Sequence, residues 1–177
     1  MVGLKMSEGQ DSSNKDRRRP ALSNSFLEIF VAASVVEGAG AGAVASILAY
    51  NGSTPDIETS WNLRFSGLEK DAMAPLAAAL LFVLKKAGPD SGITVYLADR
   101  RLPDLIASDA QSAPGQVPAF LLARIRHLVA EKAVRFDIVG EEGTPRMERM
   151  HRQARRAAID RGFSSLISVR ELVGSTA

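Results

Sequence analysis

The stretch FLEIFVAASVVEGAGAGAVASILAY, residues Phe26–Tyr50, decides the fold. It contains two apolar runs, Phe26–Val31 and Ala43–Tyr50, on either side of a segment of small residues from Glu37 to Gly42. Short, nearly continuous apolar runs of this kind are typical of strands that are buried on both faces. Small residues between two such runs predict a bend. The stretch therefore predicts two neighbouring antiparallel strands near the middle of a sheet.

A third strand is predicted over residues 57–66, where apolar and polar side chains alternate. Successive side chains of a strand point to opposite faces, so this alternation predicts one buried and one exposed face. Trp61 belongs to the apolar side, and we interpret it as a core residue rather than a platform for stacking bases. The predicted buried side comprises Ile57, Thr59, Trp61, Leu63 and Phe65.

Helices and strands alternate over the rest of the chain. A helix is predicted over residues 68–88, and Pro75 requires it to begin near Ala74 or to kink there, because proline favours the first helical turn. The last helix is predicted to be capped by Thr144. The remaining elements are a strand at Ile93–Ala98, a short helix at Leu102–Ser108, a helix at Ala119–Ala133, a strand at Val134–Gly140 and the last helix at Thr144–Ile159.

The segment EEGTPRMERMHRQARRA, residues Glu141–Ala157, carries the most specific motif. Together with the order of elements it resembles the ribonuclease H family, in which a histidine loop precedes a helix with a Glu-Arg pair, a catalytic Asp and an Ala-Arg-x-Ala tail. In this chain Glu148-Arg149, His151 and Ala154–Ala157 fall at those helix positions. The resemblance implies an α/β, ribonuclease H-like fold whose five-stranded mixed sheet has three antiparallel strands first, then two parallel ones, and is flanked by helices.

The same resemblance divides the chain into three parts. Residues 1–24 are expected to be a flexible basic tail that includes Arg17–Arg19. Residues 25–162 are expected to form the ribonuclease H-like domain, and residues 163–177 a C-terminal extension that forms a short strand or helix on the core or on a partner.

The resemblance implies the family's catalysis by two-metal hydrolysis, in which four carboxylates hold two divalent ions. The four positions fall on Ala32, on or beside Met73, on Asp99 and on His151, and the loop histidine falls on Glu141. The resemblance therefore implies a degenerate site without a metal cofactor, in which Asp99 is the one retained catalytic residue. Asp99 can also be read as a residue that caps the helix starting near Leu102.

A relocated active site is the first alternative. It is a ribonuclease H that uses Asp99 with Glu37, Glu69 or Glu142 as rearranged metal ligands, and only this alternative calls for Mg²⁺ or Mn²⁺. The second alternative is a protein-interaction or structural module that has kept the fold.

Basic side chains are concentrated in the C-terminal part of the chain. The whole chain has 22 Lys and Arg against 20 Asp and Glu, whereas residues 121–177 hold eleven basic and seven acidic side chains. If the polar faces of the last two long helices lie side by side, they form a phosphate-binding surface for RNA or an RNA/DNA hybrid. The candidate residues are Arg124, Arg126, Lys132, Arg146, Arg149, His151, Arg152, Arg155 and Arg156.

Composition excludes several other classes of protein. The sequence has no Cys, which excludes a disulfide scaffold and a thiolate site and is compatible with the cytoplasm, where we expect the protein. The most apolar run, Ala72–Leu84, is too short to cross a bilayer, which needs about 20 residues. No membrane association is expected.

Overall fold

A six-stranded mixed sheet forms the centre of the protein. The computed structural model describes residues 26–50, 52–68, 71–88, 92–108, 117–139 and 144–174. The order of strands across the sheet is β5-β4-β1-β2-β3-β6. The strands are β1 (Phe26–Val36), β2 (Gly40–Tyr50), β3 (Pro55–Phe65), β4 (Gly92–Leu97), β5 (Arg135–Ile138) and β6 (Ser165–Ile167).

The first three strands form the predicted antiparallel meander, with longer strands than the sequence indicated. The pairing of β1 with β2 runs from Phe26 opposite Tyr50 to Val36 opposite Gly40. The bend is therefore confined to Glu37–Ala39, and most of the segment read as a bend belongs to β2. β1 lies between β2 and β4 in the sheet. The small residues near its C-terminal end pair with glycines and alanines of β2.

Two strands confirm the parallel part of the predicted sheet, and a third extends it. β4 pairs in parallel with β1, and β5 pairs in parallel with β4. β6 comes from residues read as a C-terminal extension and pairs in parallel with β3, from Leu63 opposite Ser165 to Phe65 opposite Ile167. The sheet thus has six strands where five were predicted, because a three-residue strand carries too little periodicity to be recognised.

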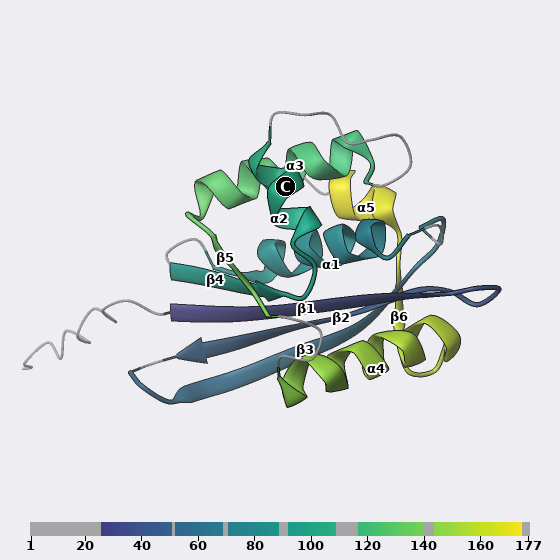
Figure 1. The fold of residues 1–177 in the computed structure, drawn as a ribbon, viewed down its shortest axis with the longest axis horizontal. Helices are drawn as coiled ribbons and strands as arrows, with labels where there is room; N and C mark the ends of the chain where they lie inside the picture. The colour runs from purple at the N-terminus through teal and green to yellow at the C-terminus, as the bar shows by residue number, and fades with distance from the viewer. Residues whose placement is uncertain are drawn as a thin grey trace, which may run out of the picture.

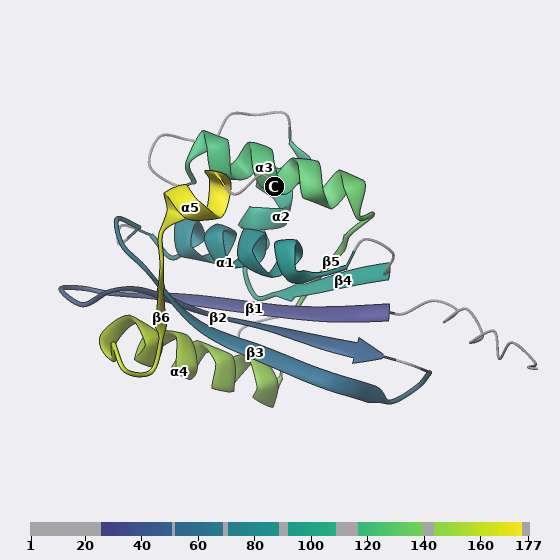
Figure 2. The same ribbon diagram turned by 180° about the vertical axis from the view of Figure 1, so that it is seen from behind.

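Helices cover the sheet on both faces, as Figures 1 and 2 show from opposite sides. α1 packs on β1 and β2 and contacts α3 and α5 above it, and α2 contacts α3. α4 packs on the other face, against β1, β2 and β3. The helices are α1 (Met73–Lys86), α2 (Arg101–Ala107), α3 (Ala119–Glu131), α4 (Pro145–Ile159) and α5 (Val169–Gly174). Within the described residues, no helix is long and apolar enough to span a membrane.

The start of α1 follows from its local sequence. The carboxylate of Asp71 accepts the backbone N–H of Met73 at 2.8 Å, so it satisfies one of the free donors at the helix start. Pro75 lies in the first turn, where a missing N–H costs no helical hydrogen bond. The prediction of a helix that begins near Ala74 is confirmed.

A glycine lets α4 approach the sheet closely. A Cβ atom added to Gly42 of β2 would lie 2.2 Å from the carbonyl oxygen of Ala154 and 2.4 Å from the nitrogen of Ala158. The helix presents small side chains at the same place, since Ala154, Ala157 and Ala158 are all buried. Helix and strand backbones therefore touch here without an intervening side chain.

The predicted alternation of β3 is correct over half of the strand. Leu63 and Phe65 are buried, and Trp61 is half-buried with its ring edge-on to Phe82 of α1 at 5.6 Å between centroids. Ile57 is 61% exposed, and Thr59 is exposed as well. The expectation of five buried residues is wrong for these two, because α1 packs on β1 and β2 and leaves the first half of β3 open.

Candidate functional site

A cavity of about 400 Å³ opens where β1 and β4 end. Its walls are residues 31–35 of β1, Ala98 and Asp99 after β4, and Asp71 and Ala72 before α1. Leu76 of α1, Arg101 of α2 and His151 of α4 complete the lining. The carboxyl ends of neighbouring parallel strands are a common place for ligand and catalytic sites in α/β proteins. We call this space the strand-end cavity.

Asp99 is bound tightly by a nearby arginine. One carboxylate oxygen, Oδ1, accepts the backbone N–H of Arg101 at 2.9 Å. The side chain of Arg101 folds back over the same carboxylate, with Nε 3.1 Å from both oxygens and Nη2 2.6 Å from Oδ2. The side-chain hydrogen bonds from Arg101 hold the pKa of Asp99 below its ordinary value, although partial burial acts in the opposite direction.

A second carboxylate faces the same arginine. Nη1 of Arg101 lies 3.9 Å from Oδ2 of Asp71. The guanidinium is therefore placed between two carboxylates that come from different elements, one before α1 and one after β4. The single positive charge of this guanidinium attracts both acids and balances one of their two negative charges without any bound ion. Sequence reasoning missed Asp71 and Arg101, since the position assigned to α1 was Met73.

The other positions assigned to metal ligands offer no oxygen donors. Ala32 and Met73 are each 1% exposed, and they pack in the two apolar cores on opposite faces of the sheet. His151, which the resemblance placed at the fourth carboxylate position, lines the strand-end cavity, and its buried Nε2 has no partner among the described residues. Three of the four assigned positions, Ala32, Asp99 and His151, thus meet at one cavity.

Of the three carboxylates proposed as replacements, only Glu37 lies among the described residues. Glu37 is exposed in the turn between β1 and β2 and is not part of the cavity wall. Glu69, Glu141 and Glu142 lie outside the described residues, as does the N-terminal tail. Within the described ranges no cluster of three or more His, Asp or Glu side chains is arranged to hold a metal ion.

The donors present in the strand-end cavity do not fit a pair of divalent cations. Such a pair requires several anionic oxygen ligands, both for coordination and to balance its charge. Among the residues that the structure describes, Asp71 and Asp99 alone supply carboxylates to the cavity wall, and the guanidinium of Arg101 contacts both.

The basic faces of α3 and α4 do not lie side by side, because the two helices pack on opposite faces of the sheet (Figure 1). Two basic side chains at α3 instead donate hydrogen bonds to backbone carbonyl groups of neighbouring elements. Arg126 donates to the carbonyl oxygens of Leu105, Ile106 and Ser108, which holds the end of α2. Lys132 donates to the carbonyl of Ala87 at 2.9 Å. Arg124 is half-buried.

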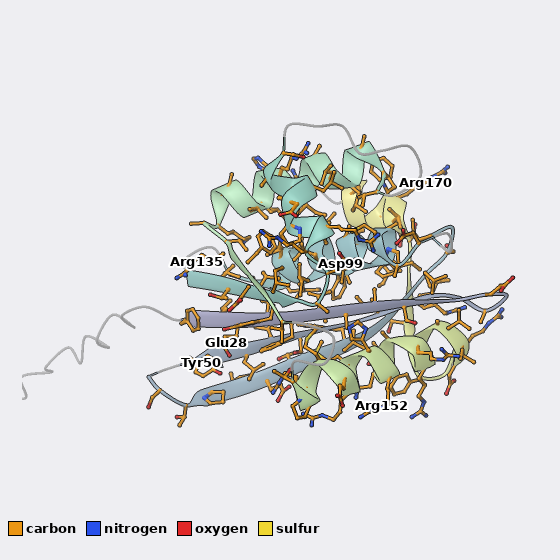
Figure 3. The ribbon with its side chains drawn as sticks, viewed as in Figure 1. Glu28, Tyr50, Asp99, Arg135, Arg152 and Arg170 are labelled. Carbon is orange, nitrogen blue, oxygen red and sulfur yellow. The ribbon has the colours of Figure 1, made fainter. Side chains whose placement is uncertain are left out.

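The α4 helix presents its arginines to solvent. Arg149, Arg152 and Arg156 are spaced three and four residues apart, so they lie along one face of the helix, and all three are exposed. We call them the α4 arginine stripe, and Figure 3 shows Arg152 on the side of α4 away from the sheet. Arg155 is exposed on a neighbouring face, whereas Arg146 is half-buried against the sheet.

Comparison with known proteins places this architecture among solved structures. No protein-family model matches the sequence, and no curated protein matches it either. The structure is similar to the N-terminal RNase H domain of a Mycobacterium tuberculosis protein, solved as a fusion with maltose-binding protein, with a TM-score of 0.56 at 14% identity. That alignment covers 76% of this chain and 96% of the other. The chain has the ribonuclease H fold.

Two further structures support the ribonuclease H fold. RNase H1 of the halophilic archaeon Halobacterium salinarum aligns with a TM-score of 0.52 at 15% identity, over 73% of this chain and 97% of its own. A foamy viral protease-reverse transcriptase chain, solved in complex with double-stranded DNA, aligns with a TM-score of 0.51 at 12% identity, over 78% and 97%. The ribonuclease H-like domain expected from the last-helix motif is therefore confirmed at the level of the fold.

Proposed function

We propose that this ribonuclease H-like domain binds nucleic acid, RNA or an RNA/DNA hybrid, and does not cleave it. The observation that carries the proposal is Arg101, whose guanidinium contacts both Asp99 and Asp71 in the strand-end cavity. In this view the protein is a pseudoenzyme that has kept the fold of a nuclease.

Loss of catalysis follows from the charges in the cavity. Hydrolysis by two metal ions requires a site that attracts about four positive charges. Here the guanidinium of Arg101 already balances one of the two carboxylate charges, and the buried Ala32 and Met73 add no ligand. A divalent cation would have to displace Arg101 and leave its positive charge nearby. We therefore propose that neither Mg²⁺ nor Mn²⁺ is a cofactor.

Nucleic-acid binding is assigned to the α4 arginine stripe. Two of its members make ion pairs, Arg152 with Glu148 of the same helix at 3.9 Å and Arg156 with Asp160 just after the helix at 3.7 Å. Exposed pairs of this type contribute about 0–1 kcal/mol, so they oppose the exchange of a carboxylate for a phosphate only weakly, and Arg156 also lies over the ring of Phe163 at 4.1 Å. The foamy viral chain with the same fold, solved with double-stranded DNA, supports a nucleic acid as the partner class.

A protein partner is the second candidate, and one observation favours it. The sheet face beside α4 carries aromatic side chains, with Phe30 and Tyr96 stacked at 4.7 Å between centroids. The hydroxyls of Tyr50 and Tyr96 donate to the carboxylate of Glu28 at 2.7 and 3.0 Å. Half-buried aromatic groups with satisfied hydroxyls are suited to contact another protein.

The proposal is tested by fluorescence anisotropy with a labelled RNA/DNA hybrid at a series of salt concentrations. Arg152→Ala combined with Arg156→Ala is expected to weaken binding and to lower the slope of log affinity against log salt by about two. The matched control combines Arg135→Ala with Arg170→Ala, which removes two exposed charges distant from α4 (Figure 3). Equal losses in both double variants would contradict binding through α4, and a protein that fails to bind any nucleic acid would contradict the function.

The cytoplasmic location expected from the composition belongs to this proposal. A fluorescent fusion of the full chain is expected to distribute through the cytoplasm. Exclusive recruitment to a membrane would contradict it.

A further inference from the structure

A second cavity, of about 240 Å³, lies between the first half of α4 and strands β2 and β3. It shares no lining residue with the strand-end cavity. The helix supplies Arg146, Arg149, Met150 and Gln153, and the strands supply Ser46, Glu58 and Ser60. We call it the helix-base cavity. Apart from Met150 its lining is polar, which is unusual for the space between a helix and a sheet.

Ser46 is the most informative residue of this cavity. It is 2% exposed and is the one buried polar residue among those the structure describes. Its hydroxyl has no hydrogen-bond partner within the described part of the chain. A buried hydroxyl without a partner destabilises a fold, so buried polar groups are nearly always satisfied by protein, water or ligand. The hydroxyl of Ser46 can therefore donate to a group that enters the cavity.

The position of Ser46 follows from the strand register. It lies opposite Phe30 of β1 and opposite Ser60 of β3, on the face of the sheet that α4 covers. Ser60 also lines the cavity, so two neighbouring hydroxyls form its base. The Ser60 hydroxyl donates to the carbonyl oxygen of Ala45 over a long 3.5 Å, so it would have to exchange this weak bond in order to donate, beside Ser46, to a second oxygen of one ligand.

The helix side of the cavity is cationic. Arg146 is held in place, because its guanidinium lies over the ring of Phe30 at 4.9 Å and Nη1 lies 2.7 Å from Oε1 of Glu58. Its side chain is 28% exposed, so it is partly removed from water. Arg149 lines the same cavity and also belongs to the α4 arginine stripe. Two guanidinium groups above two hydroxyls form a donor set suited to a tetrahedral oxyanion.

We propose that the helix-base cavity binds a phosphate group. The hydroxyls of Ser46 and Ser60 and the guanidinium groups of Arg146 and Arg149 would donate to its oxygens. If the phosphate belongs to a nucleic-acid backbone, this inference rests on the proposed function and makes the cavity an anchoring point beside the stripe. Glu58 opposes it, since its carboxylate occupies Arg146 and repels an anion.

The test measures thermal unfolding of the full chain in inorganic phosphate, with chloride added to keep the ionic strength constant. A ligand that binds the folded state raises the unfolding temperature with its concentration. Phosphate is expected to raise it for the wild-type protein. Ser46→Ala is expected to fold at least as stably without phosphate, because it removes an unsatisfied hydroxyl, and to bind phosphate about tenfold more weakly.

Glu58→Gln supplies the opposite change, and it is expected to bind phosphate more tightly than the wild type. Arg170→Ala, on α5, is the control for the loss of a positive charge and is expected to leave phosphate binding unchanged. The inference is overturned if phosphate has no effect on the wild-type protein, or if Ser46→Ala and the wild type respond equally.

Oligonucleotide binding separates the two sources of phosphate. If the site holds a backbone phosphate, Ser46→Ala weakens hybrid binding and inorganic phosphate competes with the hybrid. If the site holds free phosphate, hybrid affinity is the same in Ser46→Ala and the wild type while the phosphate response differs. If the protein binds the hybrid but phosphate does not raise its unfolding temperature, the phosphate site is overturned and the proposed function is not. If phosphate raises the unfolding temperature but no nucleic acid binds, the proposed function is contradicted and the phosphate site is not.

Discussion

Nη2 of Arg101 lies 2.6 Å from Oδ2 of Asp99, and the same guanidinium reaches to 3.9 Å from Asp71. One side chain therefore joins the end of β4 to the start of α1. In a two-metal nuclease such carboxylates face ions, which can leave and be replaced. In this protein they face the guanidinium of Arg101, which is part of the chain and cannot dissociate. The positive charge beside them is therefore fixed by the sequence.

The pairing of Asp99 with Arg101 predicts a dependence of stability on pH. Because the pKa of Asp99 is lowered in the folded state, the stabilisation is present above the ordinary carboxyl pKa of about 3.9 and is lost as pH falls through the lower folded value. Arg101→Gln should therefore reduce the free energy of unfolding near neutral pH, by about 1 kcal/mol or less since the arginine is largely exposed. Urea unfolding should show the difference shrinking below pH 4, and a constant difference would contradict the pairing.

The strand-end cavity should acquire metal affinity if the net charge of its lining is made more negative. Ala32→Asp combined with Arg101→Ala adds a carboxylate to the part of β1 that lines the cavity and removes the cation that contacts Asp71 and Asp99. This double variant should bind Mn²⁺ in calorimetric titration, and the wild type should not.

The control for this experiment pairs Ala32→Asp with Arg100→Ala. Arg100 is exposed and lies near Asp104 at 3.6 Å, outside the cavity wall. If this control binds Mn²⁺ as well as the first double variant, then Arg101 is not what excludes the metal.

Gly42→Ala should destabilise the protein, because its new Cβ would overlap the backbone of α4 at Ala154 and Ala158. Overpacking of this kind costs about 1–3 kcal/mol, and here the obstacle is backbone that cannot rotate away. Denaturant unfolding measures the change. Gly88→Ala is the matched control, since a Cβ at Gly88 meets nothing within 4 Å. Similar stabilities for the two variants would contradict the close contact between β2 and α4.

Arg126→Ala should lower the stability of the fold without changing the affinity for nucleic acid. Its guanidinium donates to three carbonyl groups at the end of α2, so its loss leaves acceptors unpaired and should cost about 1–3 kcal/mol. Hybrid affinity should stay at the wild-type level, because α3 and α4 lie on opposite faces of the sheet. A folded Arg126→Ala protein that had lost hybrid binding would show that α3 contributes to the interface.

The order of elements was predictable from local patterns in the sequence. Thr144 accepts the N–H of Met147 at 3.3 Å and caps α4 as its sequence indicates, and Pro145 follows at the first helical position. The alternation of β3 correctly marked Leu63 and Phe65 as buried. Such signals depend on a few neighbouring residues, so a single sequence contains them.

The composition of the candidate site was only partly predictable. Asp99 was found through the family resemblance, but its partners were not, because nothing in the sequence shows that Asp71 and Arg101 meet across two elements. The basic faces of α3 and α4 were visible as patterns, yet periodicity does not tell on which side of a sheet a helix packs. Ser46 gave no sequence signal, since a serine in a strand is unremarkable until its burial is known.

The most direct test of the central claim measures binding and cleavage in the same samples. A labelled RNA/DNA hybrid is incubated with the full chain in Mg²⁺ and in Mn²⁺ at two salt concentrations, read first by anisotropy and then on a denaturing gel. The account predicts binding that weakens with salt and an intact RNA strand in both metals. Metal-dependent cleavage that disappears in Asp99→Asn would contradict it.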